Sequence, residues 1–202
     1  MPRDRGFPPG YYDKHLTRNP LARWMLRGHY RTIEEYVEKT GGRRVLEIGC
    51  NRGAILERIA GAAEWVVGCD VDVDALRLGR RLLGEESLLA GGSAFSLPFR
   101  EGAFDVIVLC EILEHLDAPE EALEETARLR PKAVILSVPR EPLWRVLNMA
   151  RGAYWGSLGN TPGHVQHFST RGFLRFVERY FRVLEVRTPT PWTMVLAAPR
   201  GG

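Results

Sequence analysis

Residues 45–53, with the sequence VLEIGCNRG, constrain the fold of this chain more than any other stretch. An apolar run ends there at a glycine-bearing turn, and a stretch with helical character follows at residues 54–60. A second apolar run, at residues 65–69, ends in Asp70, twenty-one residues after Gly49. This pattern predicts a strand, a glycine turn, a helix and a second strand that ends in an acid. Such a unit is half of a nucleotide-binding fold.

Each part of this unit has a physical use. Glycine in the turn lets backbone amides approach a ligand closely, and the helix presents free N–H groups at its positive end. An acid at the end of the next strand can accept hydrogen bonds from both hydroxyls of a ribose. The residues alone leave a second interpretation open, which is a tight strand-to-helix turn that binds no ligand.

The spacing of the glycines separates two kinds of nucleotide. A dinucleotide site reads G-x-G-x-x-G, and this chain offers only Gly49-x-Asn51-x-x-Ala54. The pattern E-x-G-x-G-x-G matches better, at Glu47, Gly49 and Gly53, with Asn51 as the one departure. Asparagine adopts positive φ more easily than most residues, so it can stand in for glycine. This pattern resembles the first motif of the class I S-adenosylmethionine-dependent methyltransferases.

A second block, residues 93–116, extends the resemblance. It reads SAFSLPF, then GAFDVIVLCE, then ILEHL. These segments are similar to the family's G-D-A-x-x-L-P-F loop, F-D-V-V strand and E-x-L-E-H helix start, in the family's order. The resemblance covers about residues 43–139. It is nearest to the small single-domain branch, methyltransferase type 11, that includes the quinone-biosynthesis methyltransferases. Ser93 departs from the family pattern, which has an aspartate there for the adenine amino group.

The resemblance implies an α/β, Rossmann-like fold. Its seven-stranded, mostly parallel sheet has the order 3-2-1-4-5-7-6, with strand seven antiparallel and helices on both faces. The apolar run at 133–139 suits a buried strand stopped by proline. Residues 172–180 suit the last helix, and residues 182–187 and 193–198 suit the final strand pair. We expect an N-terminal helical cap at 1–41, a methyltransferase core at 42–202, and an acceptor-side insertion at about 140–169.

The resemblance also implies the cofactor, S-adenosylmethionine, with S-adenosylhomocysteine as the product. Asp70 would hold the ribose hydroxyls, and the backbone of Gly49 to Gly53 would face the methionine part. The full set of expected cofactor-binding residues is Glu47, Gly49, Cys50, Asn51, Gly53, Asp70, Val71, Ser93, Ala94, Cys110 and Glu111.

The three cysteines, Cys50, Cys69 and Cys110, follow or end the predicted strands that would be neighbours in the sheet. Their spacing fits neither a disulfide framework nor a metal site. One interpretation is a redox-sensitive or metal-binding trio. We prefer the other, that small side chains fit where the backbone must approach a ligand closely.

Histidines supply the candidates for acceptor chemistry. A loop rich in glycine and aromatic residues, 152–163, precedes the sequence HVQHFS, which contains His164 and His167. We expect His167, His164 or His115 to act as a base or to orient the acceptor, and the family's histidine before Phe-Ser favours His167 over His164. The alternatives are that these histidines brace the loop and that His115 is a structural cap. A metal is not expected, because His-x-x-His has no carboxylate or cysteine ligand close in sequence.

Positive charge is concentrated near the N-terminus. Residues 3–31 carry seven Arg or Lys against two Asp, in a chain with a net charge of +3. This charge can attract a phosphorylated or carboxylated substrate, a nucleic acid or an anionic membrane surface, or it can be an ordinary solvated face. Apolar residues between 21 and 37 recur at helical spacing after Asn19-Pro20, and Gly28 predicts a bend. Tyr11, Tyr12 and Tyr30 are candidates for acceptor contacts.

We expect the chain to transfer a methyl group to a small-molecule acceptor, anionic if the basic segment serves it. A nicotinamide oxidoreductase would share Asp70, but it would not explain Glu47 or the E-x-L-E-H block. A non-catalytic cofactor-binding module remains open because of Asn51 and Ser93. An RNA methyltransferase is less favoured, since the chain lacks an aromatic-basic stacking run and the N/D-P-P-[YFW] tetrapeptide.

The sequence also bears on location. No apolar run reaches the roughly 18 residues of a spanning helix. The first residues lack the apolar stretch of a signal peptide, so a cytoplasmic location is expected. The oligomeric state is not predicted.

Overall fold

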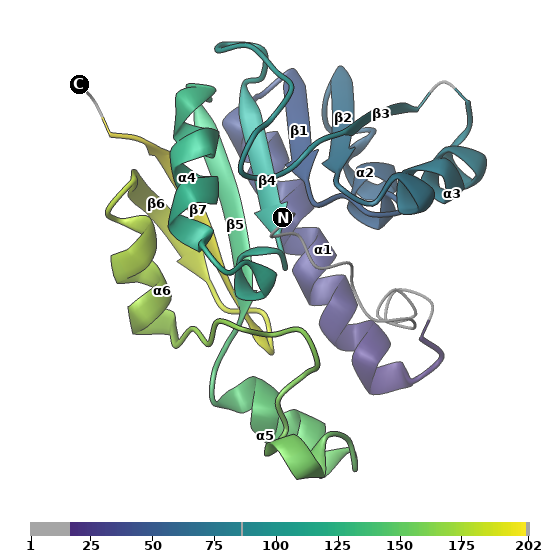
Figure 1. Cartoon of the computed structure of the whole chain (residues 1–202), viewed down its shortest axis with the longest axis vertical. Coiled ribbons are helices and arrows are strands. Elements are labelled where there is room, and N and C mark those ends of the chain that lie inside the picture. Colours follow the sequence, from purple (N-terminus) through teal and green to yellow (C-terminus); the bar gives the residue numbers. More distant parts are fainter. Residues whose placement is uncertain (1–16, 86, 201–202) are drawn as a thin grey trace.

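A computed structural model describes residues 17–85 and 87–200 and contains one seven-stranded sheet (Figure 1). Tyr11, Tyr12 and the charges of residues 3–14 lie outside the described residues. The strands are β1 Arg44–Ile48, β2 Trp65–Asp70, β3 Leu88–Gly91, β4 Val106–Cys110, β5 Ala133–Pro139, β6 Phe181–Arg187 and β7 Trp192–Pro199.

The strand order is β3-β2-β1-β4-β5-β7-β6, as predicted. Strands β3, β2, β1, β4 and β5 pair in parallel, whereas β7 pairs antiparallel with both β5 and β6. The carboxyl ends of the five parallel strands therefore share one edge of the sheet. In open α/β sheets that edge is where ligands bind.

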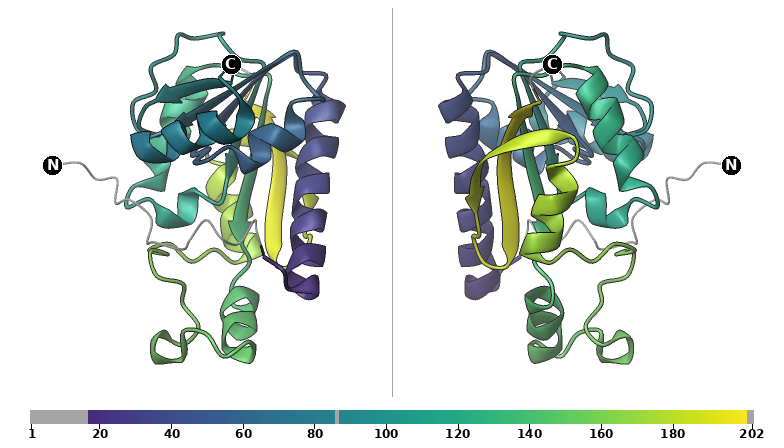
Figure 2. Two further views of the ribbon diagram at one scale, coloured as in Figure 1. Left: turned by 90° about the vertical axis from the view of Figure 1, so that its right-hand side faces the viewer. Right: turned by 90° about the vertical axis from the view of Figure 1, so that its left-hand side faces the viewer.

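Helices cover both faces of the sheet (Figure 2). They are α1 Pro20–Thr40, α2 Ala54–Ile59, α3 Val73–Leu83, α4 Pro119–Arg128, α5 Leu143–Ala150 and α6 Thr170–Val177, and the described residues also contain the short 3-10 helices η2 Leu113–His115 and η3 Trp155–Ser157. Residues of α1 and α2 pack in one apolar cluster, and residues of α4 and α6 pack in another on the opposite face. Strands β4 and β5 are buried along their whole length because both of their faces are covered.

Helix α1 packs onto the sheet. Its Ile33, Tyr36 and Val37 are almost completely buried in the apolar cluster that also contains residues of β5 and β7. The helix starts as predicted, with Pro20 in the first turn and the side chain of Asn19 accepting from the N–H groups of Leu21 and Ala22. The division between a cap at 1–41 and a core at 42–202 stays a prediction, but this helix shares the core of the domain.

The predicted bend at Gly28 is wrong, because α1 runs through this residue without a break. A Cβ atom at Gly28 would lie 3.5 Å from the Cβ of Pro189 in the β6–β7 turn. A Cβ atom at this position would therefore make an ordinary van der Waals contact with that turn.

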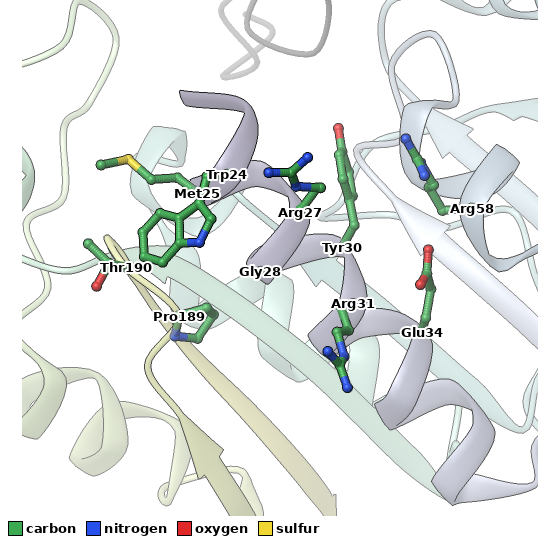
Figure 3. A pocket seen from close by; sticks show the side chains of 10 residues that line it. All are labelled: Trp24, Met25, Arg27, Gly28, Tyr30, Arg31, Glu34, Arg58, Pro189 and Thr190. Carbon is green, nitrogen blue, oxygen red and sulfur yellow. The ribbon is translucent and has the colours of Figure 1, made fainter. Parts of the chain in front are cut away.

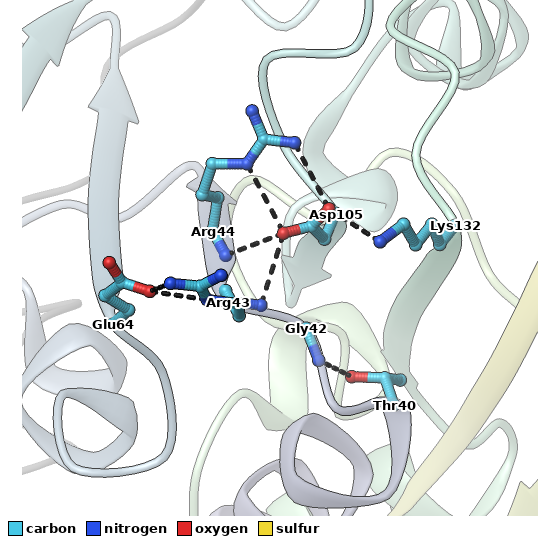
Figure 4. Close-up of polar contacts among 7 residues, drawn as sticks. All are labelled: Thr40, Gly42, Arg43, Arg44, Glu64, Asp105 and Lys132. Atoms are coloured by element: carbon cyan, nitrogen blue, oxygen red, sulfur yellow. Dashed lines mark hydrogen bonds and ion pairs between the residues drawn. The ribbon is translucent and has the colours of Figure 1, made fainter.

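Asp105 joins three strands at the amino edge of the sheet (Figure 4). Its carboxylate accepts from the backbone N–H groups of Arg43 and Arg44, at 3.2 and 3.0 Å. It also forms ion pairs with the side chains of Arg44 and Lys132, at 3.2 and 3.1 Å. The starts of β1, β4 and β5 are thereby tied together at the end opposite to the expected site.

Helix α5, η3 and the chain around them project from the carboxyl edge of the sheet (Figures 1 and 2). This part, residues 140–169, is the predicted acceptor-side insertion. None of the helices among the described residues has the length and apolar character to cross a membrane.

Candidate functional site

The turn after β1 has the backbone conformation that a nucleotide-binding turn needs. Gly49, Asn51 and Gly53 have φ values of 75°, 52° and 82°. The amides of Gly49 and Cys50 both donate to the carbonyl of Cys69 in β2, at 2.8 and 3.2 Å. The prediction that Asn51 can occupy a positive-φ position is confirmed, so the one departure from the motif leaves the turn intact.

Asp70 ends β2 and is almost completely buried. One carboxylate oxygen accepts from the N–H of Asn51 at 2.7 Å, and the other accepts from the N–H of Asp72 at 2.9 Å. Burial raises the pKa of Asp70, and the hydrogen bonds from these two amides oppose the rise. The carboxylate joins the turns that follow β1 and β2, and each oxygen keeps a lone pair for a ribose hydroxyl.

Glu47 lies inside β1 and is 2% exposed. Burial raises its pKa well above the usual value, and the charge of Asp70 adds to the rise, while a hydrogen bond from the N–H of Leu56 opposes it. Its Oε2 atom has no hydrogen-bond partner among the described residues. A buried carboxyl oxygen without a partner costs free energy, and the ammonium group of a methionine moiety can satisfy it. The site therefore fits the expected cofactor.

The positions expected to line the adenosine part differ in exposure. Val71, directly after Asp70, is 46% exposed, whereas Ala94 is buried. The hydroxyl oxygen of Ser93 accepts from the N–H of Phe95 at 3.1 Å, which stabilises the turn that contains it. That hydroxyl can still donate its own hydrogen to a ligand.

Glu111 follows Cys110 at the end of β4 and has a φ of 59°, which is uncommon for a glutamate. Its backbone N–H donates to the carbonyl of Ser137 in β5 at 3.1 Å. Its carboxylate accepts a hydrogen bond from the indole N–H of Trp192, the first residue of β7. Strained backbone of this kind collects at binding sites. Glu111 is therefore fixed at the carboxyl edge by contacts from two other strands.

Cys50, Cys69 and Cys110 are all buried, and none forms a disulfide. Burial raises the pKa of Cys69 to about 12, and it also raises the pKa of Cys50 and of Cys110. Because the thiolate is the reactive and metal-binding form, these protonated thiols are poorly suited to redox or metal chemistry. The structure agrees with the interpretation of the cysteines as packing residues.

Glu114, His115 and His164 come together beside η2. One ligand atom of each lies within 4.8 Å of the others, and the two imidazole rings meet edge to face with centroids 4.7 Å apart. Nδ1 of His115 donates to the carbonyl of Gly163, with 2.9 Å between the atoms. In a neutral ring this bond places the proton on Nδ1 and leaves a lone pair on Nε2. The cluster therefore offers an imidazole nitrogen that can accept a proton or bind a metal.

Backbone contacts hold the cluster in place. The N–H groups of Val165 and Gln166 donate to the carbonyl of Glu114, at 2.9 and 3.0 Å. The indole of Trp144 stacks on His164, with ring centroids 6.0 Å apart and planes 22° from parallel. The segment that carries His164 is thus fixed to η2, and Glu114 and His164 are both buried.

His167 lies outside this cluster. It is exposed, and its Nε2 is 2.9 Å from Oδ1 of Asn160 in the same loop. Asn160 in turn donates from its side chain to the carbonyl of His164 at 3.3 Å. These contacts brace the loop, so the structure gives no support to the preference for His167 over His164. The catalytic role of each histidine stays a prediction.

The cluster has two nitrogen ligands and one carboxylate ligand for a cation. The expectation of no metal rested on ligands close in sequence to His164 and His167, whereas Glu114 reaches His164 only through the fold. Buried imidazole and carboxylate groups in this proximity fit a borderline divalent cation such as Zn²⁺ or Mn²⁺.

Three residues of the site were missed in the sequence. Glu114 was visible, because it directly precedes His115 in the E-x-L-E-H block. Trp144 and Trp192 gave no signal, since contact with the cluster or with Glu111 depends on how α5 and β7 pack. A further polar contact, 3.1 Å between Nε2 of His29 and the hydroxyl of Ser137, brings α1 to the same edge of the sheet.

Comparisons with known proteins agree with this geometry. Residues 46–136 match the family model described as a methyltransferase domain. Demethylmenaquinone methyltransferase of Paenarthrobacter aurescens is 31% identical over 137 residues, which cover 65% of this chain and 54% of that protein. Ubiquinone biosynthesis O-methyltransferase of Thiobacillus denitrificans is 35% identical over 95 residues, 44% of this chain and 40% of that protein. The chain spans about half the length of the curated relatives it matches.

Solved structures share the fold at low identity. The PH0226 protein of Pyrococcus horikoshii superposes with a TM-score of 0.74 at 16% identity, over 96% of this chain and 100% of that one. Magnesium protoporphyrin IX methyltransferase of Synechocystis, solved with bound S-adenosylhomocysteine, gives a TM-score of 0.64 at 16% identity, over 91% and 89% of the two chains. The family match and the relatives show that residues 46–136 are a domain of the S-adenosylmethionine-dependent methyltransferase family, and the fold agrees with the class I type, so the cofactor expected is S-adenosylmethionine.

Proposed function

We propose that this chain transfers the methyl group of S-adenosylmethionine to a hydroxyl group of an aromatic small molecule. The observation that carries the proposal is the cluster of Glu114, His115 and His164. Methyl transfer from a sulfonium needs alignment of the acceptor, and it needs a base only when the nucleophile is protonated. A phenolic hydroxyl, with a pKa of about 10, is protonated near neutral pH. An imidazole oriented by a backbone carbonyl beside a buried carboxylate suits such an acceptor.

In this proposal Nε2 of His115 takes the hydroxyl proton as the acceptor oxygen bonds to the methyl carbon. The carbon–sulfur bond of the cofactor breaks, and S-adenosylhomocysteine leaves. Glu114 stabilises the imidazolium that forms, because its carboxylate is buried within a few ångströms of the ring. Gly163 keeps the ring oriented through Nδ1.

Two further features support an aromatic acceptor. Trp144 and Trp192 lie 6.0 Å apart between ring centroids, beside His164 and Glu111, and the partly exposed Trp144 offers aromatic surface for ring stacking. Several relatives are named for quinone biosynthesis, including the yeast ubiquinone biosynthesis O-methyltransferase. A hydroxyl group on the aromatic ring of a quinone precursor would be an acceptor consistent with both features.

The cofactor would lie along the carboxyl ends of β1, β2 and β4. We assign the ribose to Asp70, the methionine part to Glu47 and the backbone of Gly49 to Gly53, and the adenine to the turn at Ser93 and Ala94. Residues 140–169 would form the wall on the acceptor side. This assignment separates cofactor-binding residues from those that contact the acceptor.

A panel of phenols and catechols, scored by release of S-adenosylhomocysteine, tests the proposal. With an accepted substrate, His115→Ala should lower turnover by about a hundredfold or more, as expected for loss of a general base. His167→Ala is the matched control and should retain most of the turnover. Both variants should bind S-adenosylhomocysteine as the unchanged chain does. Full turnover by His115→Ala would exclude the base, and no methylation of any acceptor would favour a non-catalytic module.

The ligand set of the cluster favours a second role, as ligands of a divalent cation. When bound there, a cation would lower the pKa of an acceptor hydroxyl. Glu114, His115 and His164 would then hold the cation, and the acceptor oxygen would still lie beside them. A chelator separates the two roles. Turnover that is unchanged in EDTA supports the base, whereas turnover lost in EDTA and restored by Zn²⁺ or Mn²⁺ supports the cation.

A further inference from the structure

Two segments far apart in the sequence share an unusual charge pattern. Residues 17–33 contain four arginines and no acid, and residues 142–177 also contain four arginines and no acid. The chain as a whole carries 25 acidic residues, so their absence from these two segments leaves both segments positively charged. The first segment contains the first four turns of α1, up to Ile33, and the second contains α5, η3 and all of α6.

These segments lie toward the same end of the molecule. The N-terminal turns of α1 and the projecting α5–η3 region both lie beyond the carboxyl edge of the sheet in each view (Figures 1 and 2). The proposed acceptor site opens at the same edge. The cationic segments therefore flank the side from which an acceptor would arrive.

Large apolar side chains are exposed on the same two segments. They are Leu21, Trp24, Val146, Tyr154, Trp155 and Leu158, and each is more than a third exposed. Trp155 and Leu158 are the extreme cases, at 63% and 69%. Grouped apolar side chains of this size on a protein surface mark an interaction site more often than chance exposure.

The tip that carries Trp155 and Leu158 is held in a defined conformation. Leu158 has a φ of 50°, which leucine rarely adopts. Nε of Arg145 donates to the carbonyl of Leu158 at 2.9 Å, and the side-chain amide of Asn148 donates to the carbonyl of Gly159 at 2.8 Å. Bonds from α5 thus maintain a strained turn that leaves an apolar side chain in solvent. Such strain is retained where it serves binding.

Helix α1 contributes a second apolar and basic surface. Trp24 and Arg27 lie on its exposed side and line an open cavity of about 500 Å³ between α1, Arg58 and the β6–β7 turn (Figure 3). The indole of Trp24 is 57% exposed. Tryptophan beside arginine is the combination that concentrates at the boundary between lipid headgroups and acyl chains.

We propose that Leu21, Trp24, Trp155 and Leu158, with Arg23, Arg27 and Arg151, form a docking end that binds the surface of an anionic lipid bilayer. The apolar side chains would enter the boundary between headgroups and acyl chains, and the arginines would lie among the anionic headgroups. This inference depends on surface residues only and goes beyond the proposed function. If the acceptor is a lipophilic quinone precursor, docking would also bring the site to the phase in which that acceptor dissolves.

The composition of the docking end favours a bilayer over other partners. Leu21 and Leu158 have no aromatic face for stacking a base, so they would add little to binding of a single-stranded nucleic acid. A second copy of the chain would bring two positively charged segments together, which is electrostatically unfavourable. An anionic bilayer offers negative headgroups for the arginines and an apolar interior for the leucine side chains.

Co-sedimentation of the full chain with vesicles, without cofactor or acceptor, tests the inference independently of methyl transfer. We expect binding to phosphatidylcholine vesicles that contain phosphatidylglycerol, little binding to phosphatidylcholine alone, and weaker binding as salt rises. The double variant Trp155→Ser with Leu158→Asn should bind about tenfold more weakly or worse. Asparagine tolerates the left-handed backbone at position 158, so the turn should persist.

A matched control removes similar apolar surface elsewhere. Trp65, 56% exposed at the start of β2, and Leu82, 67% exposed in the last turn of α3, lie outside the docking end. Trp65→Ser with Leu82→Asn should bind vesicles as the unchanged chain does. The inference is overturned by absence of binding to anionic vesicles, by equal loss in both double variants, by displacement with single-stranded RNA, or by a dimer that requires Trp155 and Leu158.

Discussion

Single residues in uncommon backbone conformations surround the proposed site. Asn51 and Glu111 have positive φ without being glycine, and each directly follows a turn or strand end at the carboxyl edge of the sheet. Both are fixed by a partner from another strand, Asn51 through its N–H to Asp70 and Glu111 through its carboxylate to Trp192. The positions of the polar groups are therefore set before a ligand binds, which lowers the cost of ordering them on binding.

The first prediction concerns the role of Asp70 in cofactor binding. Asp70→Ala should weaken binding of S-adenosylhomocysteine about ten- to hundredfold, because a charge-assisted hydrogen bond is worth about 1.5–3 kcal/mol. Calorimetry measures the affinity directly. Asp70→Asn is the informative companion, since its one remaining side-chain oxygen can still accept from Asn51 and should recover part of the affinity. An unchanged affinity in a folded Asp70→Ala variant would remove this residue from the cofactor site.

At the scale of elements, apolar runs and turn residues in the sequence predicted the bounds of the last two strands to within one residue at each end. The strand predicted at 193–198 is observed at Trp192–Pro199, and its partner predicted at 182–187 is observed at Phe181–Arg187. The order of the strands, however, came from resemblance to a family, since no periodicity encodes it. The helix predicted at 172–180 lies at Thr170–Val177, because the Ser169 hydroxyl oxygen caps it earlier by accepting from the N–H of Gly172.

The candidate site also contains residues that local sequence motifs predict and residues that only tertiary contacts bring together. Most of the expected cofactor residues lie in short continuous motifs, which is why the sequence could name them. The cluster at His115 needs a loop about fifty positions later to fold back onto η2, and only tertiary contacts such as Val165 to Glu114 decide that. Sequence spacing could therefore name three candidate histidines, but it could not show which of them meet.

The amino edge of the sheet carries the second prediction. The Arg44 guanidinium lowers the pKa of Asp105 below its usual range, with Lys132 contributing and burial opposing. Asp105→Asn should lower the free energy of unfolding by about 2 kcal/mol at neutral pH, since charged hydrogen bonds to strand ends are lost. Because the folded pKa is depressed, this stabilisation is present above the unfolded pKa of about 4 and is lost as the pH falls through the folded pKa.

Urea unfolding of both proteins at neutral and acid pH measures this effect. The difference between the unchanged chain and Asp105→Asn should narrow below about pH 4. Asp74→Asn is the control, because Asp74 forms an exposed ion pair with Arg77 and should matter little at any pH. A cost of Asp105→Asn that stays constant on acidification would contradict the electrostatic explanation.

The region around α5 carries the third prediction. The buried side-chain amide of Asn148 donates to the carbonyl of Gly159 at 2.8 Å and to the hydroxyl of Thr161 at 3.1 Å. Asn148→Ala should therefore increase hydrogen exchange of residues 152–163 while exchange in β4 and β5 stays slow, because local opening needs less free energy than global unfolding. Arg182→Ala, an exposed change in β6, is the control. Faster exchange throughout the sheet would show that residues 140–169 are not a separate unit of stability.

At the scale of the whole molecule, cofactor binding should stabilise the chain. The proposed ligand surface joins β1, β2 and β4 through turns at Gly49, Asp70 and Glu111, so a bound molecule would contact three strand ends together. A ligand at a hundred times its dissociation constant adds about 2.7 kcal/mol to the free energy of unfolding. For a chain of this size that is a rise in melting temperature of roughly 5–10 °C.

Thermal unfolding with S-adenosylhomocysteine should show this rise, and NAD at the same concentration should give none. The pyrophosphate of NAD requires close backbone approach at a G-x-G-x-x-G turn. Here Asn51 and Ala54 hold two of the three glycine positions, and side chains at both would obstruct that approach. Asp70→Ala should reduce the shift with S-adenosylhomocysteine, which ties the stabilisation to this site. A larger shift with NAD would contradict the assignment of the cofactor.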